Sequence, residues 1–298
     1  MTPASDRGSG MDAQARIEAE LTAAIARASG PDCPPKFAAA LHDAVFPGGA
    51  RVRPQLCLAV AHACGDPDPK LTDAAAAAIE LMHCASLVHD DLPVFDDADL
   101  RRGRPSIHAA YGEPLAVLVG DALIVMAFET IGRAGVAAPR RLPRLLSVIS
   151  EAVGAPRGIA AGQAWESEDT IPLETYHRAK TGALFVGATC AGATAAGADP
   201  GPWRLLGEKI GEAYQVADDL LDAVGAADAG KPAGQDAAHN RPSCVAELGT
   251  DGAVARLKSL VAEAAAAVPD CDGAEAMREL VCAQAKRLVP KNLAVTAA

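Results

Sequence analysis

The stretch that decides the fold is residues 71–92, which read LTDAAAAAIELMHCASLVHDDL. The run is nearly continuous in Ala, Ile, Leu and Val, and a helix that is apolar on every side is buried inside its protein. Pro93 follows directly, and proline ends a helix because it has no backbone N–H and its ring clashes with the preceding turn. We therefore predict a long buried helix that ends at the first acidic segment of the chain.

The rest of the chain also predicts helices. Apolar residues recur every four positions at Ile17, Leu21 and Ile25. Only 3% of the residues are aromatic and no stretch alternates with period two, which favours closely packed helices over a sheet. We predict an all-α protein with a single domain over residues 12–298, preceded by a disordered leader at residues 1–11. Its further helices are expected near residues 55–63, 114–133, 141–154, 173–198, 202–224, 241–267 and 273–288.

Composition excludes several classes of protein. The formal net charge is −11, whereas nucleic-acid binding needs a basic surface, so no nucleic-acid partner is expected. The eight cysteines form no C-x-x-C pair, which argues against a zinc site or a disulfide framework and is typical of reduced thiols in the cytosol. The N-terminal residues do not form a secretory signal, and no window of about 20 residues is free of charge, as a membrane span requires. We expect a soluble, cytoplasmic protein.

Two acidic segments stand out against this apolar background. Residues 89–99 read HDDLPVFDDAD and are followed by LRRG, and residues 214–222 read YQVADDLLD. Each segment follows an apolar helical run, where carboxylates meet the partial negative charge of a helix C-terminus and destabilise it unless a cation binds. Carboxylate oxygens suit hard cations, chiefly Mg²⁺, which also takes water and phosphate oxygens as ligands.

Spacing within these segments predicts which carboxylates converge. Asp218 and Asp222 are four residues apart and so share one face of a helix. Asp90 and Asp96 do not share a face, but a loop after Pro93 can return Asp96 to the cation that Asp90 binds. A solvated acidic helix end is the alternative reading of one such segment, and two segments with adjacent arginines make it less attractive.

Basic residues lie where anions would bind. Residues 48–54, GGARVRP, form a glycine turn that opens toward a helix, and backbone amides with arginine make an anion site. Lys180 lies in an apolar helix, where its charge is unfavourable without an anion. His83 lies two turns before Asp90, and Lys231 lies in a glycine- and proline-rich loop that can close over a ligand. Taken alone, His83 is more often a core histidine and Lys231 a solvent-facing lysine, but the position of Lys231 shortly after the second acidic motif favours a role in binding.

Together these motifs carry a family resemblance. The chain resembles the trans (E-type) isoprenyl diphosphate synthases, the short-chain prenyltransferases, over roughly residues 40–245. The motifs in order are the glycine-arginine loop, the first aspartate-rich motif with Arg-Arg-Gly, Gly162-Gln163, Lys180-Thr181-Gly182, the second aspartate-rich motif and the Gly-Lys loop. The stretches HCASLVHDDLPVFDDADLRRG, AGQAWESE and GKPAGQDAAHNRPS are similar to the geranylgeranyl diphosphate synthases of carotenoid and bacteriochlorophyll pathways.

The resemblance implies a fold and an activity. The fold would be an isoprenoid-synthase-type helical bundle around a deep central cavity, a polyprenyl synthetase domain that usually forms a homodimer. The enzyme would be a transferase of the geranylgeranyl and (2E,6E)-farnesyl diphosphate synthase type. It would condense isopentenyl diphosphate head-to-tail with an allylic diphosphate, farnesyl diphosphate, by Mg²⁺-assisted ionisation. The released diphosphate would remove the proton that ends each cycle.

The resemblance also assigns roles to single residues. The Mg²⁺ ligands would be Asp90, Asp91, Asp96, Asp218, Asp219 and Asp222. The allylic diphosphate would be bound by Arg101, Lys180 and Lys231. Isopentenyl diphosphate would be bound by Gly49, Arg53, His83 and Arg102. Thr181 and Gln215 would point oxygens at the carbocation and, with Lys180 and Lys231, form the catalytic set.

This chain departs from the family pattern at a few positions. The family usually has Lys where this chain has Ala50, and Arg51 has its own counterpart in the family, so a cation for isopentenyl diphosphate is missing. Milder departures are Glu166 for Asp, Arg241 for Lys and Ser243 for Thr.

Product length is expected to depend on the helix before Asp90. One isoprene unit is about 5 Å long, close to the helix pitch of about 5.4 Å, so moving the cavity floor by one turn changes the product by about one unit. Ala85 and Ser86 are small, whereas family members that stop at farnesyl diphosphate tend to have an aromatic ring nearby. We predict a twenty-carbon product with Leu81 and Met82 as the floor; the alternative is that Ala85 only packs the helix.

Other functions remain open at this point. A class I terpene cyclase shares the first acidic motif but normally lacks the second D-D-x-x-D and the Arg-Arg-Gly, and its cavity is lined with aromatic rings. A non-catalytic subunit that shifts the product length of a partner synthase would be consistent with Ala50, but such subunits typically lose acidic motifs. A structural helical bundle with incidental acids is the third reading. A turnover assay on the purified chain separates these classes.

Overall fold

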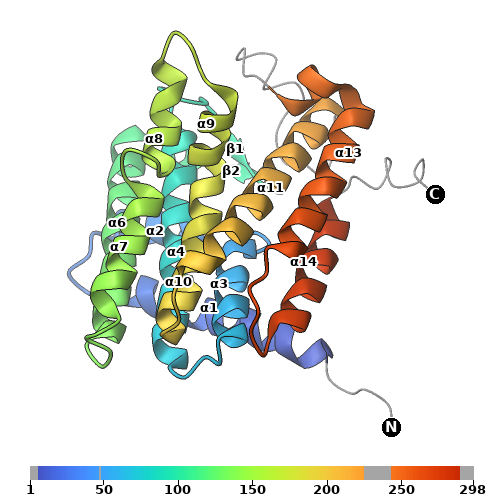
Figure 1. The fold of residues 1–298 in the computed structure, drawn as a ribbon. Coiled ribbons are helices and arrows are strands. Elements are labelled where there is room, and N and C mark those ends of the chain that lie inside the picture. The colour runs from blue at the N-terminus through green and yellow to red at the C-terminus, as the bar shows by residue number, and fades with distance from the viewer. Residues whose placement is uncertain (1–5, 47, 225–242, 289–298) are drawn as a thin grey trace. The chain divides into compact units, whose positions relative to one another are not determined.

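The structure is a computed structural model that describes residues 6–46, 48–224 and 243–288. Helices make up nearly all of its elements (Figure 1), which confirms the predicted all-α class. The α-helices are α1 Asp6–Ala28, α2 Pro35–Val45, α3 Val52–Ala63, α4 Pro69–Asp90, α5 Ile107–Tyr111, α6 Glu113–Gly135, α7 Leu142–Val153, α8 Ile159–Ala164, α9 Leu173–His177, α10 Ala183–Ala196, α11 Arg204–Val224, α13 Cys244–Ala266 and α14 Ala274–Leu288. Shorter elements are the 3₁₀ turns η1 Trp165–Ser167 and η3 Gly201–Trp203 and the π-helical turn η2 Arg178–Gly182.

The chain divides into two compact units. Unit 1 comprises residues 1–149 and 191–199, and unit 2 comprises residues 150–190 and 200–298. Helices α7 and α10 each begin in one unit and end in the other. The single domain expected over the chain stays a prediction.

The N-terminal segment differs from its expected form. Helix α1 begins at Asp6, so residues 6–11, which were expected in a disordered leader, are helical. Residues 1–5 lie outside the described range.

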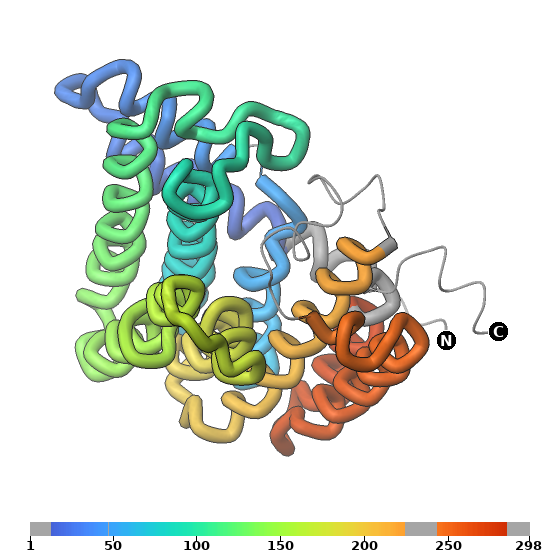
Figure 2. Tube along the Cα trace, turned by 90° about the horizontal axis from the view of Figure 1, so that it is seen from above, coloured from blue at the N-terminus to red at the C-terminus, as the bar shows by residue number. Residues whose placement is uncertain are grey.

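Helix α4 forms the core of unit 1, as the opening stretch of sequence predicts. Asp68 caps the helix, because its carboxylate accepts the N–H of Leu71, and Pro69 occupies the first turn, where no N–H is needed. The helix packs against α3 and α6, and Figure 2 shows α4 (teal) beside α6 (green). It ends at Asp90 rather than at Leu92, since the N–H of Leu92 turns back to the carbonyl of His89 at 3.1 Å.

A short hairpin follows the first acidic motif. Strands β1 Leu100–Arg101 and β2 Arg104–Pro105 pair antiparallel, and both turn residues between them, Arg102 and Gly103, have positive φ. Positive φ at both central positions is the requirement of a type I′ hairpin turn. The sequence did not predict this hairpin because Arg-Gly replaces the usual Asn-Gly.

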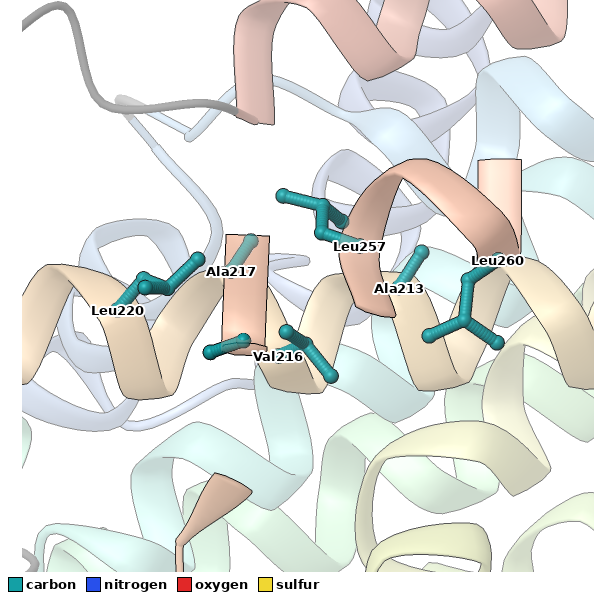
Figure 3. Packing of buried hydrophobic residues seen from close by; sticks show 7 residues of the cluster. Ala213, Val216, Ala217, Leu220, Leu257 and Leu260 are labelled. Atoms are coloured by element: carbon teal, nitrogen blue, oxygen red, sulfur yellow. The ribbon is translucent and has the colours of Figure 1, made fainter. Parts of the chain in front are cut away.

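Unit 2 is built on the packing of α11 against α13. Ala213, Val216, Ala217 and Leu220 of α11 form a buried cluster with Ala253, Leu257 and Leu260 of α13 (Figure 3). The segment expected as one helix over residues 173–198 is instead interrupted by the π turn η2 between α9 and α10. Such single π turns are frequent at functional sites.

Two helices meet a membrane span's requirements of length and composition alone. In α4, 78% of the apolar window is buried inside the protein, so its hydropathy is accounted for by the core of unit 1. In α6 the buried share is 44%. The search covered only the described residues.

Candidate active site

The first acidic motif folds back on itself as predicted. Asp90 is the last residue of α4, and the N–H of Asp96 donates to its backbone carbonyl at 3.0 Å. The N–H of Ala98 likewise donates to the carbonyl of Asp91 at 3.1 Å. Asp90 and Asp96 are both half-buried, and this loop returns Asp96 to the end of the helix. Two expected ligands of the same cation are thus joined through their backbones.

Asp91 has a different environment. It is only 3% exposed, and its two oxygens accept from the Nε of Arg101 at 3.0 and 3.2 Å, with Nη2 of the same arginine also donating to Oδ1. Bidentate carboxylate–guanidinium pairs fix the plane of the arginine. Asp91 therefore orients Arg101, the residue expected to bind the allylic diphosphate.

The glycine-arginine loop brings two guanidinium groups against the backbone. A Cβ added to Gly48 would lie 2.0 Å from Cζ of Arg51, and one added to Gly49 would lie 2.6 Å from Cζ of Arg102. A side chain at either glycine would force these guanidinium groups to move. Gly49 and Arg102, predicted to bind the same substrate, are therefore adjacent.

Arg51 is committed to the protein interior. It is 2% exposed and donates to Oε1 of Glu18 at 2.9 Å, to Oε1 of Glu80 at 2.8 Å and to the carbonyl of Val45 at 2.8 Å. Burial works to lower the pKa of its guanidinium, but hydrogen bonds to Glu18 and the charge of Glu80 raise that pKa overall. Arg51 therefore does not take the place of the missing lysine at Ala50, which is itself exposed.

Arg53 and His83 lie together, as expected for two residues that bind one substrate. Nη1 of Arg53 is 3.4 Å from Nε2 of His83. Because a guanidinium only donates, Nε2 is the acceptor and the imidazole proton is on Nδ1. Burial, reinforced by the charges of Arg53 and Arg102, holds the pKa of His83 well below its usual value. The imidazole is therefore neutral near pH 7.

The residues expected to set product length lie inside unit 1. Ala85 is 2% exposed, and Leu81 and Met82 are fully buried. Ser86 is half-buried and its hydroxyl donates to the carbonyl of His83 at 2.8 Å. Their role in product length stays a prediction.

The second acidic motif lies on α11 in unit 2. Asp218 is exposed and Asp222 is half-buried, whereas Asp219 is only 2% exposed. Oδ1 of Asp219 accepts from Nε2 of Gln215 at 2.9 Å, and Oδ2 accepts from the N–H of Cys244 at 2.7 Å. The hydroxyl of Thr181 donates to Oε1 of Gln215 at 2.6 Å, so the two residues expected beside the carbocation are in contact.

Lys180 lies in the π turn η2 and pairs with Glu166. Tyr176 donates its hydroxyl to Oε1 of Glu166 at 2.6 Å, and Gln163 donates to Oε2 at 3.0 Å. A Cβ on Gly162 would lie 2.3 Å from the backbone nitrogen of Lys180, which explains the glycine of the Gly-Gln motif. Glu166 therefore supplies a counter-ion for the half-buried Lys180.

Sequence reasoning missed some of these partners. The unfavourable burial of Lys180 signalled an anion nearby, but nothing in the spacing identified Glu166 or Tyr176. Lys231, and Arg241 among the departures, lie outside the described residues. Ser243 is described, and its hydroxyl caps α13 by accepting the N–H of Ala246 at 3.2 Å.

The comparisons with known proteins decide the family. The family model for polyprenyl synthetase matches residues 34–277. The chain belongs to the polyprenyl synthetase family. It is 55% identical over 94% of its length to geranylgeranyl diphosphate synthase of Cereibacter sphaeroides, 97% of which is covered. It is 51% identical to geranylgeranyl diphosphate synthase of Rhodobacter capsulatus, with the same coverage of both chains.

Solved structures agree with this family. A geranyltransferase from Helicobacter pylori, solved with magnesium and isoprenyl diphosphate, has a TM-score of 0.80 at 25% identity and covers 96% of this chain and 100% of its own. One from Legionella pneumophila has a TM-score of 0.78 at 26% identity and covers 93% of this chain and 94% of its own. The isoprenoid-synthase fold expected from the sequence is thereby confirmed.

The carboxylates of the two acidic motifs are suited to binding magnesium. Among the described residues no three His, Cys, Asp or Glu side chains cluster closely enough to hold a metal by themselves. Magnesium usually takes one or two carboxylates and completes its shell with water and substrate phosphate. Asp90 with Asp96, and Asp218 with Asp222, are sets of that kind.

Replacing His83 with Asn is expected to make stability less sensitive to acid. An imidazole whose pKa is lowered in the folded state gains its proton more readily in the unfolded chain, so the wild type loses stability as the pH falls below about 6.5. The variant lacks this contribution. Urea unfolding at about pH 7.5, 6.5 and 5.5 measures the slope, with His62→Asn at an exposed position as the matched control. Equal slopes in wild type and His83→Asn would contradict the buried neutral imidazole.

Proposed function

We propose that the protein is a geranylgeranyl diphosphate synthase. It condenses isopentenyl diphosphate head-to-tail with an allylic diphosphate, farnesyl diphosphate, and gives a twenty-carbon product for carotenoid biosynthesis. The observation that carries this proposal is the 55% identity, over 94% of the chain, to a protein of that name. Both acidic motifs and the basic residues expected to bind diphosphate are retained. We further propose that it acts in the cytoplasm as a homodimer.

Each part of the site has a proposed role in the reaction. Asp90, Asp96, Asp218 and Asp222 keep exposed surface and would hold magnesium. When bound, magnesium neutralises charge on the diphosphate as its bond to carbon breaks. Arg101, fixed by Asp91, and the lysines Lys180 and Lys231 bind that diphosphate.

The second substrate and the carbocation are served by other residues. Gly49, Arg53, His83 and Arg102 hold isopentenyl diphosphate so that its double bond lies near the allylic carbon. The oxygens of Thr181 and Gln215 stabilise the cation. The neutral imidazole of His83 contributes a hydrogen bond rather than a charge.

A turnover assay on the purified chain tests the proposal. The chain is incubated with Mg²⁺, isopentenyl diphosphate and farnesyl diphosphate, and the products are separated by chromatography. We expect geranylgeranyl diphosphate, and no product after chelation of the metal. Hydrocarbon products would instead indicate a terpene cyclase, and absence of any product would indicate a non-catalytic subunit.

An aromatic ring near Ala85 is expected to shorten the product. Ala85→Phe, or Ser86→Phe at the neighbouring half-buried position, would close the space that the last isoprene unit occupies, so farnesyl diphosphate should accumulate from a shorter primer. Ala85→Ser is the small control, and thermal unfolding shows that each variant is folded. An unchanged twenty-carbon product from both folded phenylalanine variants would show that this face of α4 does not determine product length.

Restoring a lysine at position 50 is expected to improve binding of isopentenyl diphosphate. A charge-assisted hydrogen bond from Ala50→Lys to phosphate should lower the KM for that substrate by about five- to tenfold. The KM for farnesyl diphosphate should not change. Ala50→Gln supplies length without charge and is the matched control. If the lysine leaves the KM unaltered or raises it, Ala50 does not lie beside isopentenyl diphosphate.

A further inference from the structure

We infer that Asp219 is a positioning residue rather than a magnesium ligand, and that its carboxylate fixes the orientation of Gln215 and through it the hydroxyl of Thr181. The inference rests on the proposed function and changes one part of it. The sequence grouped Asp219 with Asp218 and Asp222 because all three are aspartates of one motif.

Burial separates the three aspartates. Asp218 is exposed and Asp222 half-buried, but Asp219 is 2% exposed. On an α-helix Asp219 is turned by about 100° from Asp218 and about 60° from Asp222, so its burial, more than helix geometry, separates its side chain from the face that Asp218 and Asp222 share. Asp219 therefore points into unit 2 rather than toward that face.

The hydrogen bonds of Asp219 occupy both of its oxygens. One accepts the N–H of Cys244 at 2.7 Å, and the other accepts Nε2 of Gln215 at 2.9 Å. A metal ion at this carboxylate would have to displace a donor, and a buried donor left without an acceptor is destabilising. The carboxylate already has the environment that a buried anion needs.

The direction of these bonds is fixed by chemistry. A carboxylate only accepts, so Gln215 must present its NH₂ group to Asp219 and its carbonyl oxygen to Thr181. The hydroxyl of Thr181 must then donate to that oxygen, at 2.6 Å. The threonine proton is thus committed to Gln215, and the lone pairs of its oxygen are left for a cation. A reversed amide would turn N–H groups toward Thr181 instead.

A rigid support holds this chain of hydrogen bonds in place. In the sequence Asp219 lies between Ala217 and Leu220, which belong to the apolar cluster that packs α11 against α13. Figure 3 shows both residues of that cluster. Cys244 is the first residue of α13, so its N–H is one that the helix itself cannot satisfy. The carboxylate of Asp219 joins the start of α13 to the catalytic amide of Gln215.

Asp219→Asn tests the inference. Asparagine can keep the bond from Cys244 through its oxygen, but it presents NH₂ to Gln215 and so reverses the amide. We expect kcat to fall by about tenfold or more, with the Mg²⁺ concentration for half-maximal rate changed by less than about twofold. Asp218→Asn, at a proposed ligand, is the matched control and should raise that Mg²⁺ concentration.

A double variant that exchanges the carboxylate and the amide between positions 219 and 215 tests whether kcat can be rescued. When Asp219→Asn is combined with Gln215→Glu, the carboxylate introduced by the second change accepts from the side-chain amide introduced by the first and from the hydroxyl of Thr181. Every donor in the chain of hydrogen bonds then meets an acceptor again. We expect this double variant to recover most of the lost kcat. It also serves if the single variant does not fold, because its donors and acceptors are matched.

A binding measurement that needs no turnover completes the test. The thermal shift produced by Mg²⁺ with inorganic diphosphate should be the same in Asp219→Asn as in wild type and smaller in Asp218→Asn. A raised Mg²⁺ requirement or a lost thermal shift in Asp219→Asn would overturn the inference, as would an unchanged kcat or a double variant without rescue. An inactive wild type that still shows the shift would instead contradict the proposed function alone.

Discussion

The structure depends on how it accommodates carboxylates at the C-terminal ends of helices, where negative charge is unfavourable. The first motif begins at the C-terminal end of α4 and the second lies in the last turns of α11, where the helix dipole opposes negative charge. Both motifs accommodate this negative charge in the same way. The middle aspartate, Asp91 or Asp219, is buried and surrounded by donors, while its neighbours keep exposed surface for a cation. In each repeated pair, one aspartate is buried among hydrogen-bond donors and the other keeps the exposed surface that our proposal assigns to magnesium.

Buried cations follow the same rule with opposite sign. Arg51 is paired with Glu18 and Glu80 inside unit 1, and Lys180 is paired with Glu166 inside unit 2. An ion removed from water is tolerated only with a partner of opposite charge and with hydrogen bonds. The two cations differ in exposure, because Arg51 is buried in the core whereas Lys180 keeps some exposed surface.

Sequence pattern was sufficient for the helical fold, and it grouped site residues that the structure places in contact, such as Arg53 with His83 and Thr181 with Gln215. The apolar run before Asp90 predicted α4 to within two residues at each end, because a helix buried on all sides is apolar in composition throughout. Contacts between residues far apart in the sequence could not be predicted from its composition or spacing. Arg51 meets Glu18, and Asp219 meets Cys244, only because separate helices pack together. The hairpin turn at Arg102 was also not predicted, because arginine is not a residue that usually adopts positive φ in such turns.

The π-helical turn between α9 and α10 limits how this chain can change in length. A π turn holds one residue more than the α-helical turn that it replaces, and each helical residue rotates the chain by about 100°. Loss of a single residue there would wind the turn into α-helix and swing Tyr176 round the axis, away from Glu166. A deletion at this place is therefore far more damaging than a substitution, and alignments of related chains should keep it free of gaps.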